Sequence, residues 1–223
     1  TPYCPEDAPY AVYIDPIDGS LNWDRGVGDP CVVISVSFNR SISQLDELCF
    51  AYVFGLRSGD EYWVEEGKAY YRSALLGQVG EIQTNCRVRS IEEMVAYLRP
   101  GYGLAGTHFQ KTEKVYHRVK DIRAFDNTGI EFCEIARGAA DLMIESRDGS
   151  DGFNLLAFPI LKAAGGGLFD LGGNDLSTRP INLNSKYNYI AIGNRQLLGQ
   201  VLEVINQCKA FDEKSPISQQ AMA

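Results

Sequence analysis

The chain has 223 residues, of which 45% are hydrophobic and 22% charged, a composition typical of a globular protein with a large core. Its formal net charge of −8 argues against nucleic acid as a partner, because an acidic surface repels the phosphate backbone. No stretch approaches the roughly 18 apolar residues of a membrane helix, so no membrane association is expected. The six cysteines stand singly, which indicates reduced thiols and a cytoplasmic location.

The first third of the chain is predicted to form strands, because it contains short runs of aromatic and β-branched residues between turn residues. These runs cover residues 10–14, 31–38, 48–56, 61–65 and 69–72. The last three are separated by short segments that contain Gly59 or Gly67, which predicts an antiparallel meander.

Residues 91–98 are predicted to form a helix that begins with a capping box. Ser90 is a candidate N-cap, Glu93 follows three residues later, and Pro100 ends the pattern. A boundary between two lobes is expected there, so that residues 1–100 form a first lobe and residues 101–208 a second, with a flexible tail over residues 209–223.

The second half alternates helical and strand periods, which predicts layered helices and sheets. Helices are expected over residues 129–138 and 153–164 and after Asn194, and strands over residues 141–145, 168–171 and 189–192. The segment 153–164 is nearly all apolar and must be buried on most faces. Pro159 lies inside it and would cost about 3 kcal/mol unless the helix is kinked there.

The segment most informative about chemistry contains Asp15, Pro16, Ile17, Asp18, Gly19 and Ser20. If the chain turns here, the Cα atoms of Asp15 and Asp18 lie within about 7 Å, and both carboxylates can point to one place. Such a pair repels itself unless a cation lies between, and Mg²⁺ prefers oxygen ligands. Gly19 and Ser20 can offer backbone N–H groups to a phosphate. The pattern predicts metal-assisted phosphoryl chemistry, with an ordinary solvated turn as the alternative.

Residues 14–23 resemble the first signature of the inositol monophosphatase family, which includes fructose-bisphosphatase-like enzymes. The similarity continues in order through residues 31–38, 60–72, 126–145 and 163–170. It implies an α-β-α-β-α layered sandwich of the α+β or α/β class, the sugar-phosphatase fold, of which this chain is expected to lack the N-terminal helices. It also implies a lithium-sensitive homodimer that uses Mg²⁺, with Mn²⁺ as a substitute and no organic cofactor, to hydrolyse a small phosphate ester.

The resemblance also assigns roles to individual residues. Asp15, Asp18 and the carbonyl of Ile17 would bind metal, whereas Gly19 and Ser20 would bind the phosphate. Ser20 stands where the family has Thr, and its hydroxyl would orient the attacking water, so that Asp18 and Ser20 are the expected catalytic residues. Further along the chain, substrate contacts are implied for Thr128, Gly129 and Glu145, with a helix N-cap and a strand-end acid as the alternative interpretation.

The second family signature is a Trp-Asp pair at the start of the apolar helix, followed by an acidic residue before Ala-Gly-Gly. This chain departs from it: counting back from Gly165 places Phe153 at the aspartate position, and counting forward from Glu145 places Gly152 there. Asp151 is the nearest carboxylate and is the predicted third metal ligand. Asp148 is the alternative ligand, and Asp151 could instead be a simple N-cap.

The family also carries a glutamate ligand and a further acid before the first signature, which this chain does not include. Glu6 and Asp7 are the nearest substitutes, with exposed loop acids as the alternative. We therefore expect a truncated form or fragment of the enzyme. Inositol monophosphate is the first expected substrate, then fructose 1,6-bisphosphate, then 3'-phosphoadenosine 5'-phosphate or NADP. A non-catalytic regulatory or binding homologue is the alternative from another functional class.

Overall fold

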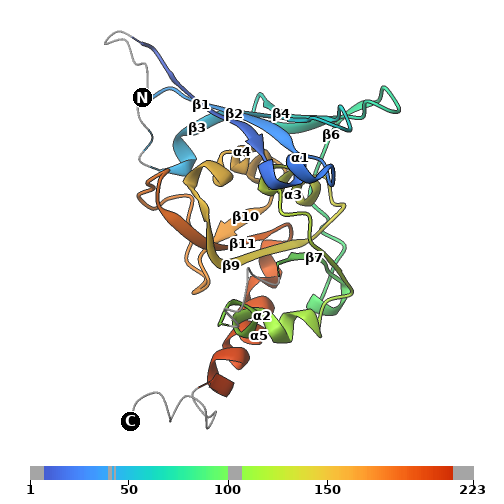
Figure 1. The fold of residues 1–223 in the computed structure, drawn as a ribbon, viewed down its shortest axis with the longest axis vertical. Helices are drawn as coiled ribbons and strands as arrows, with labels where there is room; N and C mark the ends of the chain where they lie inside the picture. The colour runs from blue at the N-terminus through green and yellow to red at the C-terminus, as the bar shows by residue number, and fades with distance from the viewer. Residues whose placement is uncertain (1–7, 40–41, 43, 100–106, 213–223) are drawn as a thin grey trace.

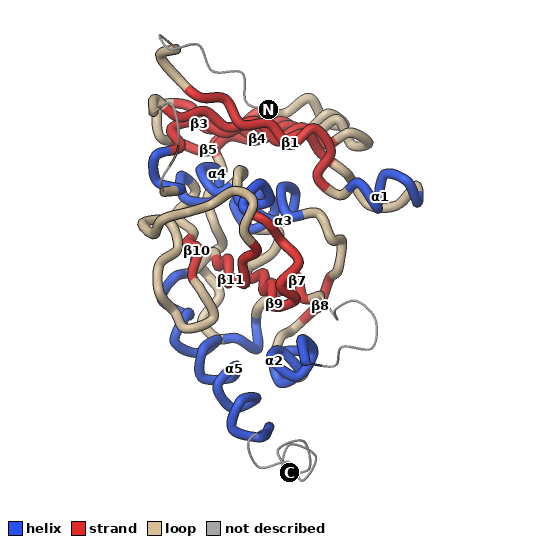
Figure 2. Tube along the Cα trace, turned by 60° about the vertical axis from the view of Figure 1, so that its left-hand side comes forward, coloured by secondary structure: helices blue, strands red, loops and turns tan. Residues whose placement is uncertain are grey.

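Two β-sheets alternate with two layers of helices (Figures 1 and 2). This computed structural model describes residues 8–39, 42, 44–99 and 107–212. From one end of the molecule to the other lie a six-stranded sheet, helices α3 and α4, a five-stranded sheet, and helices α2 and α5. The predicted layered class of helices and sheets is confirmed.

The first sheet is an antiparallel meander in which the strands follow one another in chain order. Its strands are β1 (Ala11–Asp18), β2 (Cys31–Ser37), β3 (Leu48–Gly55), β4 (Glu61–Glu65), β5 (Lys68–Arg72) and β6 (Val79–Glu81). Four of these strands confirm predicted runs, and β1 extends beyond the run predicted for it. The 3₁₀-helix η1 (Leu45–Glu47) precedes β3. Strand β6 was not predicted, because Val79-Gly80-Glu81 is short, all three of its residues are exposed, and it carries no apolar pattern.

Helices α3 (Thr128–Ala136) and α4 (Phe158–Ala163) lie between the sheets and build the larger core. Helix α3 confirms the predicted helix over residues 129–138. The single helix predicted over residues 153–164 is wrong, because the segment divides into the 3₁₀-helix η3 (Gly152–Leu155) and α4. Pro159 lies in the first turn of α4, where the missing N–H costs no hydrogen bond.

The second sheet has the strand order β10-β11-β9-β7-β8. Its strands are β7 (Val95–Leu98), β8 (Asp121–Arg123), β9 (Leu142–Asp151), β10 (Gly167–Phe169) and β11 (Lys186–Ile192). The helix predicted over residues 91–98 is wrong: only Ile91–Glu93 turns, as the 3₁₀-helix η2, and Ser90 makes no side-chain cap. Parallel pairing of β7 with β9 and β8 overrides the local helical pattern and buries Tyr97 and Leu98.

Helices α2 (Thr107–Tyr116) and α5 (Leu198–Asp212) cover the far face of the second sheet. The 3₁₀-helix η4 (Arg195–Leu197) leads into α5, and Asn194 caps it as predicted by accepting a hydrogen bond from Gln196 N. Side chains of α5, among them Val201 and Ile205, pack on the sheet in a second core. None of the described helices combines the length and apolar character needed to cross a membrane.

The lobe boundary expected near residue 100 lies outside the described residues, as do Glu6 and Asp7. The two sheets nevertheless divide the chain between β6 and β7. Helix α5 extends to Asp212, into the predicted tail, and the rest of that tail lies outside the described residues.

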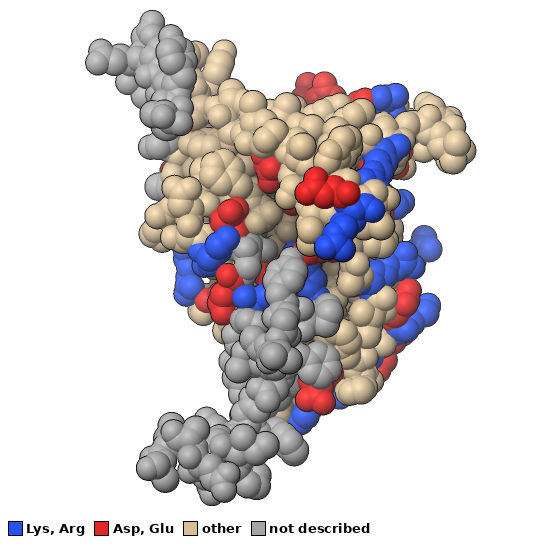
Figure 3. Space-filling model, viewed as in Figure 1, with Lys and Arg blue, Asp and Glu red and all other residues tan. Residues whose placement is uncertain are grey.

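The outer face of the six-stranded sheet is covered by no helix of the described residues (Figure 2). On the edge strand β1, Val12 is 55% exposed and Ile14 51% exposed on this face. The alternate residues of β2, Val32, Ile34 and Val36, are half-buried on the same face, whereas Cys31 and Val33 point into the core. In Figure 3 the surface above these strands carries few charged side chains. A run of apolar residues on the outward face of a strand is typical of a sheet that is covered on that side as well.

Candidate active site

A bulge in β1 brings the two predicted metal-binding carboxylates to the same side of the sheet. Asp15 pairs with Val33 of β2 and Asp18 pairs with Cys31, so three residue steps on β1 oppose two on β2. In a regular strand, residues three apart point to opposite faces, and one extra residue reverses this. Pro16, which has no N–H to pair, lies within the bulge of this edge strand. The strand therefore continues through Asp15 and Pro16, where the sequence predicted that it stops and turns.

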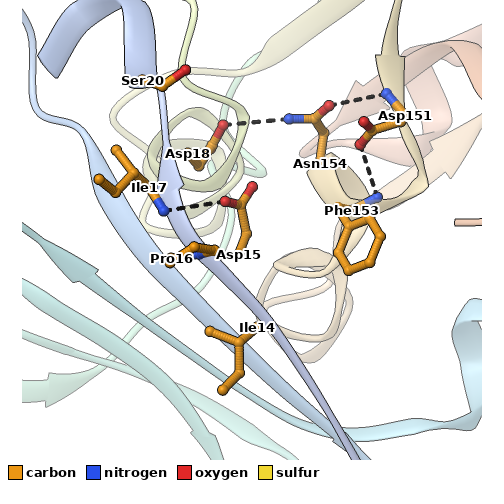
Figure 4. Close-up of a pocket in the computed structure, with 10 residues that line it drawn as sticks. Ile14, Asp15, Pro16, Ile17, Asp18, Ser20, Asp151, Phe153 and Asn154 are labelled. Atoms are coloured by element: carbon orange, nitrogen blue, oxygen red, sulfur yellow. Dashed lines mark hydrogen bonds between the residues drawn. The ribbon is translucent and has the colours of Figure 1, made fainter. Parts of the chain in front are cut away.

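The bulge forms one wall of a cavity of about 410 Å³, and the start of η3 forms the opposite wall (Figure 4). The cavity brings together the residues predicted for metal and phosphate binding: Asp15, Ile17, Asp18, Gly19, Ser20 and Asp151. Phe153 and Asn154 complete the wall on the η3 side. Thr128, Gly129 and Glu145 are not among the residues that line it.

Asp18 is buried and is held by donors from two other elements. The backbone N–H of Gly129, in the first turn of α3, donates to Asp18 Oδ2 at 2.5 Å, and Asn154 Nδ2 donates to Oδ1 at 3.4 Å. Burial raises the pKa of Asp18 to about 7, and the negative charge of Asp15 adds to the effect. Gly129 is required at its position because an added Cβ would lie 2.8 Å from Cys31 Sγ and 3.1 Å from Asp18 Oδ2.

Asp15 lies beside Asp18 on the same wall. Its Oδ1 accepts a hydrogen bond from the backbone N–H of Ile17 at 3.2 Å, which stabilises the bulge. Burial raises the pKa of Asp15, and the negative charge of Asp151 raises it further. Acidic groups that repel one another in one cavity provide the environment in which a divalent cation is stabilised.

Asp151 lines the cavity and is also the N-cap of η3. Its Oδ1 accepts from Phe153 N at 3.1 Å, and its backbone N–H donates to Asn154 Oδ1 at 3.0 Å, which together form a capping box. The N-cap alternative is therefore confirmed, while the carboxylate still faces the cavity (Figure 4). Asp148, the alternative ligand, is exposed and bonded to Asn188, and it does not line the cavity.

Gly19 and Ser20 form the start of helix α1 (Ser20–Arg25) at the mouth of the cavity. Gly19 has φ +81°, a conformation that favours glycine, and an added Cβ would lie 3.3 Å from the Asn127 side chain. Ser20 is exposed and lines the cavity.

Thr128 and Glu145 belong to a buried charge cluster behind the cavity. Glu145 is fully buried and pairs with Arg99 Nη1 at 3.0 Å and with Arg147 Nη2 at 2.6 Å. Arg99 also contacts Glu131, and Thr128 Oγ1 lies 3.4 Å from Arg99 Nη2. These contacts give Glu145 and Thr128 structural partners, and their role in binding substrate stays a prediction.

The donor set suits a sparsely ligated hard cation. Among the residues that the structure describes, no three His, Cys, Asp or Glu side chains form a compact metal cage. Mg²⁺ is commonly bound by one or two carboxylates, several waters and substrate phosphates rather than by an all-protein cage. Asp15 and Asp18, with Asp151 on the opposite wall, fit that mode of binding.

No family model matches the chain, but individual proteins do. A fructose-1,6-bisphosphatase/inositol-1-monophosphatase of Archaeoglobus fulgidus is 27% identical over 200 residues, which are 87% of this chain and 69% of the relative. The protein of that name from Methanocaldococcus jannaschii is 23% identical over 88% of this chain and 70% of its own length. The solved structure of an IMPase from Thermotoga maritima matches with a TM-score of 0.70 and 20% identity, over 92% of this chain and 72% of that one. The chain is related to the inositol monophosphatase family.

The sequence did not predict one residue of the cavity, Asn154. The second signature of the inositol monophosphatase family is a Trp-Asp pair, and the chain has Phe153-Asn154 just before the apolar helix, with the Asn154 side chain facing Asp18 (Figure 4). A search for carboxylates alone passes over this position. The aromatic residue before an amide, just ahead of the apolar helix, is the signal that could have found it.

Proposed function

We propose that the chain is a metal-dependent phosphate monoester hydrolase whose active site is the cavity between β1 and η3. The observation that carries this proposal is the bulge, which turns Asp15 and Asp18 toward one cavity beside the Gly19–Ser20 turn. The names of the relatives, fructose-1,6-bisphosphatase/inositol-1-monophosphatase, support a phosphate ester as the substrate.

In this proposal Asp15, Asp18, Asp151 and the carbonyl of Ile17 hold Mg²⁺, with Mn²⁺ as a substitute. When bound, the cation would lower the pKa of an attacking water molecule and neutralise negative charge on the phosphate. The backbone N–H groups of Gly19 and Ser20 bind phosphate oxygens, and the Ser20 hydroxyl orients the water. The N–H of Gly129 keeps the Asp18 carboxylate in a fixed orientation.

Inositol monophosphate is the first substrate that we propose, and fructose 1,6-bisphosphate the second, in a homodimer. A second candidate function is a non-catalytic homologue that binds phosphate esters. The observation that favours this candidate is Asn154, an amide at the point where a further carboxylate would complete the acidic cavity.

The test is phosphate release from inositol 1-phosphate and fructose 1,6-bisphosphate in the presence of Mg²⁺, for the unaltered chain and for Asp18→Asn. Loss of a metal-binding carboxylate should lower the rate at least about 100-fold. Equal rates for both proteins would refute the assignment of the site. Saturable phosphate binding to this cavity without any release would support the non-catalytic candidate instead.

A further inference from the structure

Asn154 connects the two acidic walls of the cavity through both ends of its amide. Its Oδ1 accepts from the backbone N–H of Asp151 at 3.0 Å, and its Nδ2 donates to Asp18 Oδ1 at 3.4 Å (Figure 4). The first contact belongs to the capping box that begins η3. The geometry therefore fixes which end of the amide faces Asp18: it is the donor end.

A donor and a cation compete for the same position on a carboxylate oxygen. An amide NH₂ group carries partial positive charge and has no lone pair to offer a metal. A cation that approaches Asp18 Oδ1 from the side of η3 must displace this group. Turning the amide over would present its oxygen, but the hydrogen bond to Asp151 N would then be lost.

Other carboxylate oxygens of the cavity also accept hydrogen bonds from the backbone. Asp18 Oδ2 accepts from Gly129 N, Asp15 Oδ1 accepts from Ile17 N, and Asp151 Oδ1 accepts from Phe153 N. The Asp151 side chain is moreover 38% exposed and lies 3.8 Å from Lys186 Nζ. The cavity therefore offers a divalent cation few strong ligands on the side of η3.

We propose that Asn154 sets the divalent-cation affinity of this cavity and keeps it low, and that Asn154→Asp converts the cavity into a tight cation site. The inference deepens the proposed function, on which it rests. An aspartate at position 154 would place a carboxylate where the amide now contacts Asp18. Two carboxylates at that separation are stabilised by a cation between them.

The test measures binding of Mn²⁺ alone to the full chain, through the electron paramagnetic resonance signal of free Mn²⁺ and by calorimetry. Asn154→Asp should tighten Mn²⁺ binding by at least about 10-fold, the lower end of what a metal-site substitution commonly changes. Asn154→Ala, which removes the competing donor without adding a ligand, should tighten Mn²⁺ binding by a smaller factor, about 3-fold.

Asn206→Asp is the matched control, because it adds the same charge at an exposed position on α5, far from the cavity. Equal affinity of the Asn154→Asp and Asn206→Asp variants would overturn the proposal. If a variant folds poorly, its melting temperature is measured with and without Mn²⁺. Larger stabilisation by Mn²⁺ in Asn154→Asp than in Asn154→Ala supports the proposal, and Asn154→Asp that stays unfolded in saturating Mn²⁺ overturns it.

Failure of this inference can be told apart from failure of the proposed function. An unaltered chain that releases no phosphate would refute hydrolysis, but a gain of Mn²⁺ affinity in Asn154→Asp would still support the role of Asn154. Conversely, Mg²⁺-dependent phosphate release by the unaltered chain without any affinity gain in the variant would leave the hydrolase in place and remove the inference.

Discussion

Arg99 shows how much a single buried charge contributes to this fold. Its side chain is 4% exposed and contacts the fully buried Glu131 and Glu145. Burying such charges is costly, and the cost is offset only while each has its partner. Glu131 lies on α3 and Glu145 on β9, so Arg99 links the helix layer to the second sheet.

We predict that Arg99→Leu lowers the free energy of unfolding by about 3–5 kcal/mol, because the buried Glu131 and Glu145 both lose their ion pair with Arg99. Urea denaturation measures this change. Arg118→Ala is the control, because Arg118 pairs with Glu92 at the surface, where both side chains are nearly half exposed. It should leave the unfolding curve almost unchanged. Similar losses of unfolding free energy in the two variants would contradict the claim that the buried ion pairs stabilise the fold more than the exposed pair does.

Asp18 makes the stability of the metal-free chain dependent on pH. Its pKa is about 7 in the folded chain, against 3.8 for an unperturbed aspartate. The unfolded chain thus loses this proton at lower pH than the folded chain does, and the stabilisation present below pH 4 is lost as the pH rises through 7. We predict that Asp18→Asn removes this part of the decline, worth at most about 4 kcal/mol. Urea denaturation at pH 5 and pH 8 in EDTA measures the free energy of unfolding of both proteins. An equal fall in this free energy from pH 5 to pH 8 in the two proteins would contradict the prediction.

At the scale of elements, the first turn of α3 is fitted closely against β2. Gly129 contacts the β2 side chains Cys31 and Val33 and donates to Asp18, so the helix start positions the cavity wall. Asn127 caps the helix by accepting from Ile130 N and packs beside Gly19. A shift of this turn would therefore move Asp18 as well as destabilise the core.

We predict that Gly129→Ala costs about 1–3 kcal/mol of stability, because the new Cβ would lie 2.8 Å from Cys31 Sγ and from Val33 Cγ2. Gly199→Ala in α5 is the matched control. An added Cβ at Gly199 has no neighbour within 4 Å, and alanine should stabilise the helix by about 0.5–1 kcal/mol. Thermal melts compare the melting temperature of each variant with that of the unaltered chain. An unchanged melting temperature in Gly129→Ala would contradict the prediction.

How far the sequence predicts an element depends on whether its pattern is set locally. The period-2 runs of β2 to β5 and the cap at Asn194 were predictable because each residue pattern matches its own element. Residues 91–98 were not, since pairing with β9 decides their conformation. The acidic pair at positions 15 and 18 was found, but the bulge that makes the pair face one way depends on register with β2.

At the scale of the whole molecule, one apolar sheet face has no helix of the described residues upon it. It includes β1, the edge strand among the described strands of this sheet, where Val12 and Ile14 are about half exposed. Exposed apolar faces and edge strands of this kind promote association with other chains. The outward residues of the neighbouring strand β2, Val32, Ile34 and Val36, are also apolar, so the feature extends inward from the edge.

We predict that the chain binds the dye ANS and self-associates at high concentration, and that the double substitution Val12→Lys and Ile14→Lys reduces both without lowering the melting temperature. Light scattering and dye fluorescence provide the measurement. Leu75→Lys controls for added charge, because Leu75 is 91% exposed in the turn before β6. If this control reduced association as strongly, the face on β1 would not be the cause.

The number of residues between Asp15 and Asp18 decides, through the bulge at Pro16, whether the two carboxylates face the same side of the sheet. Removing one residue between Asp15 and Asp18 would restore ordinary strand parity and turn one carboxylate away from the other, while the sheet itself could remain intact. A one-residue deletion here would therefore remove one carboxylate from the proposed metal site, as the loss of an aspartate would. When sequences of this kind are aligned, a deletion at this point should be weighed as a change in chemistry and not as a harmless difference in loop length.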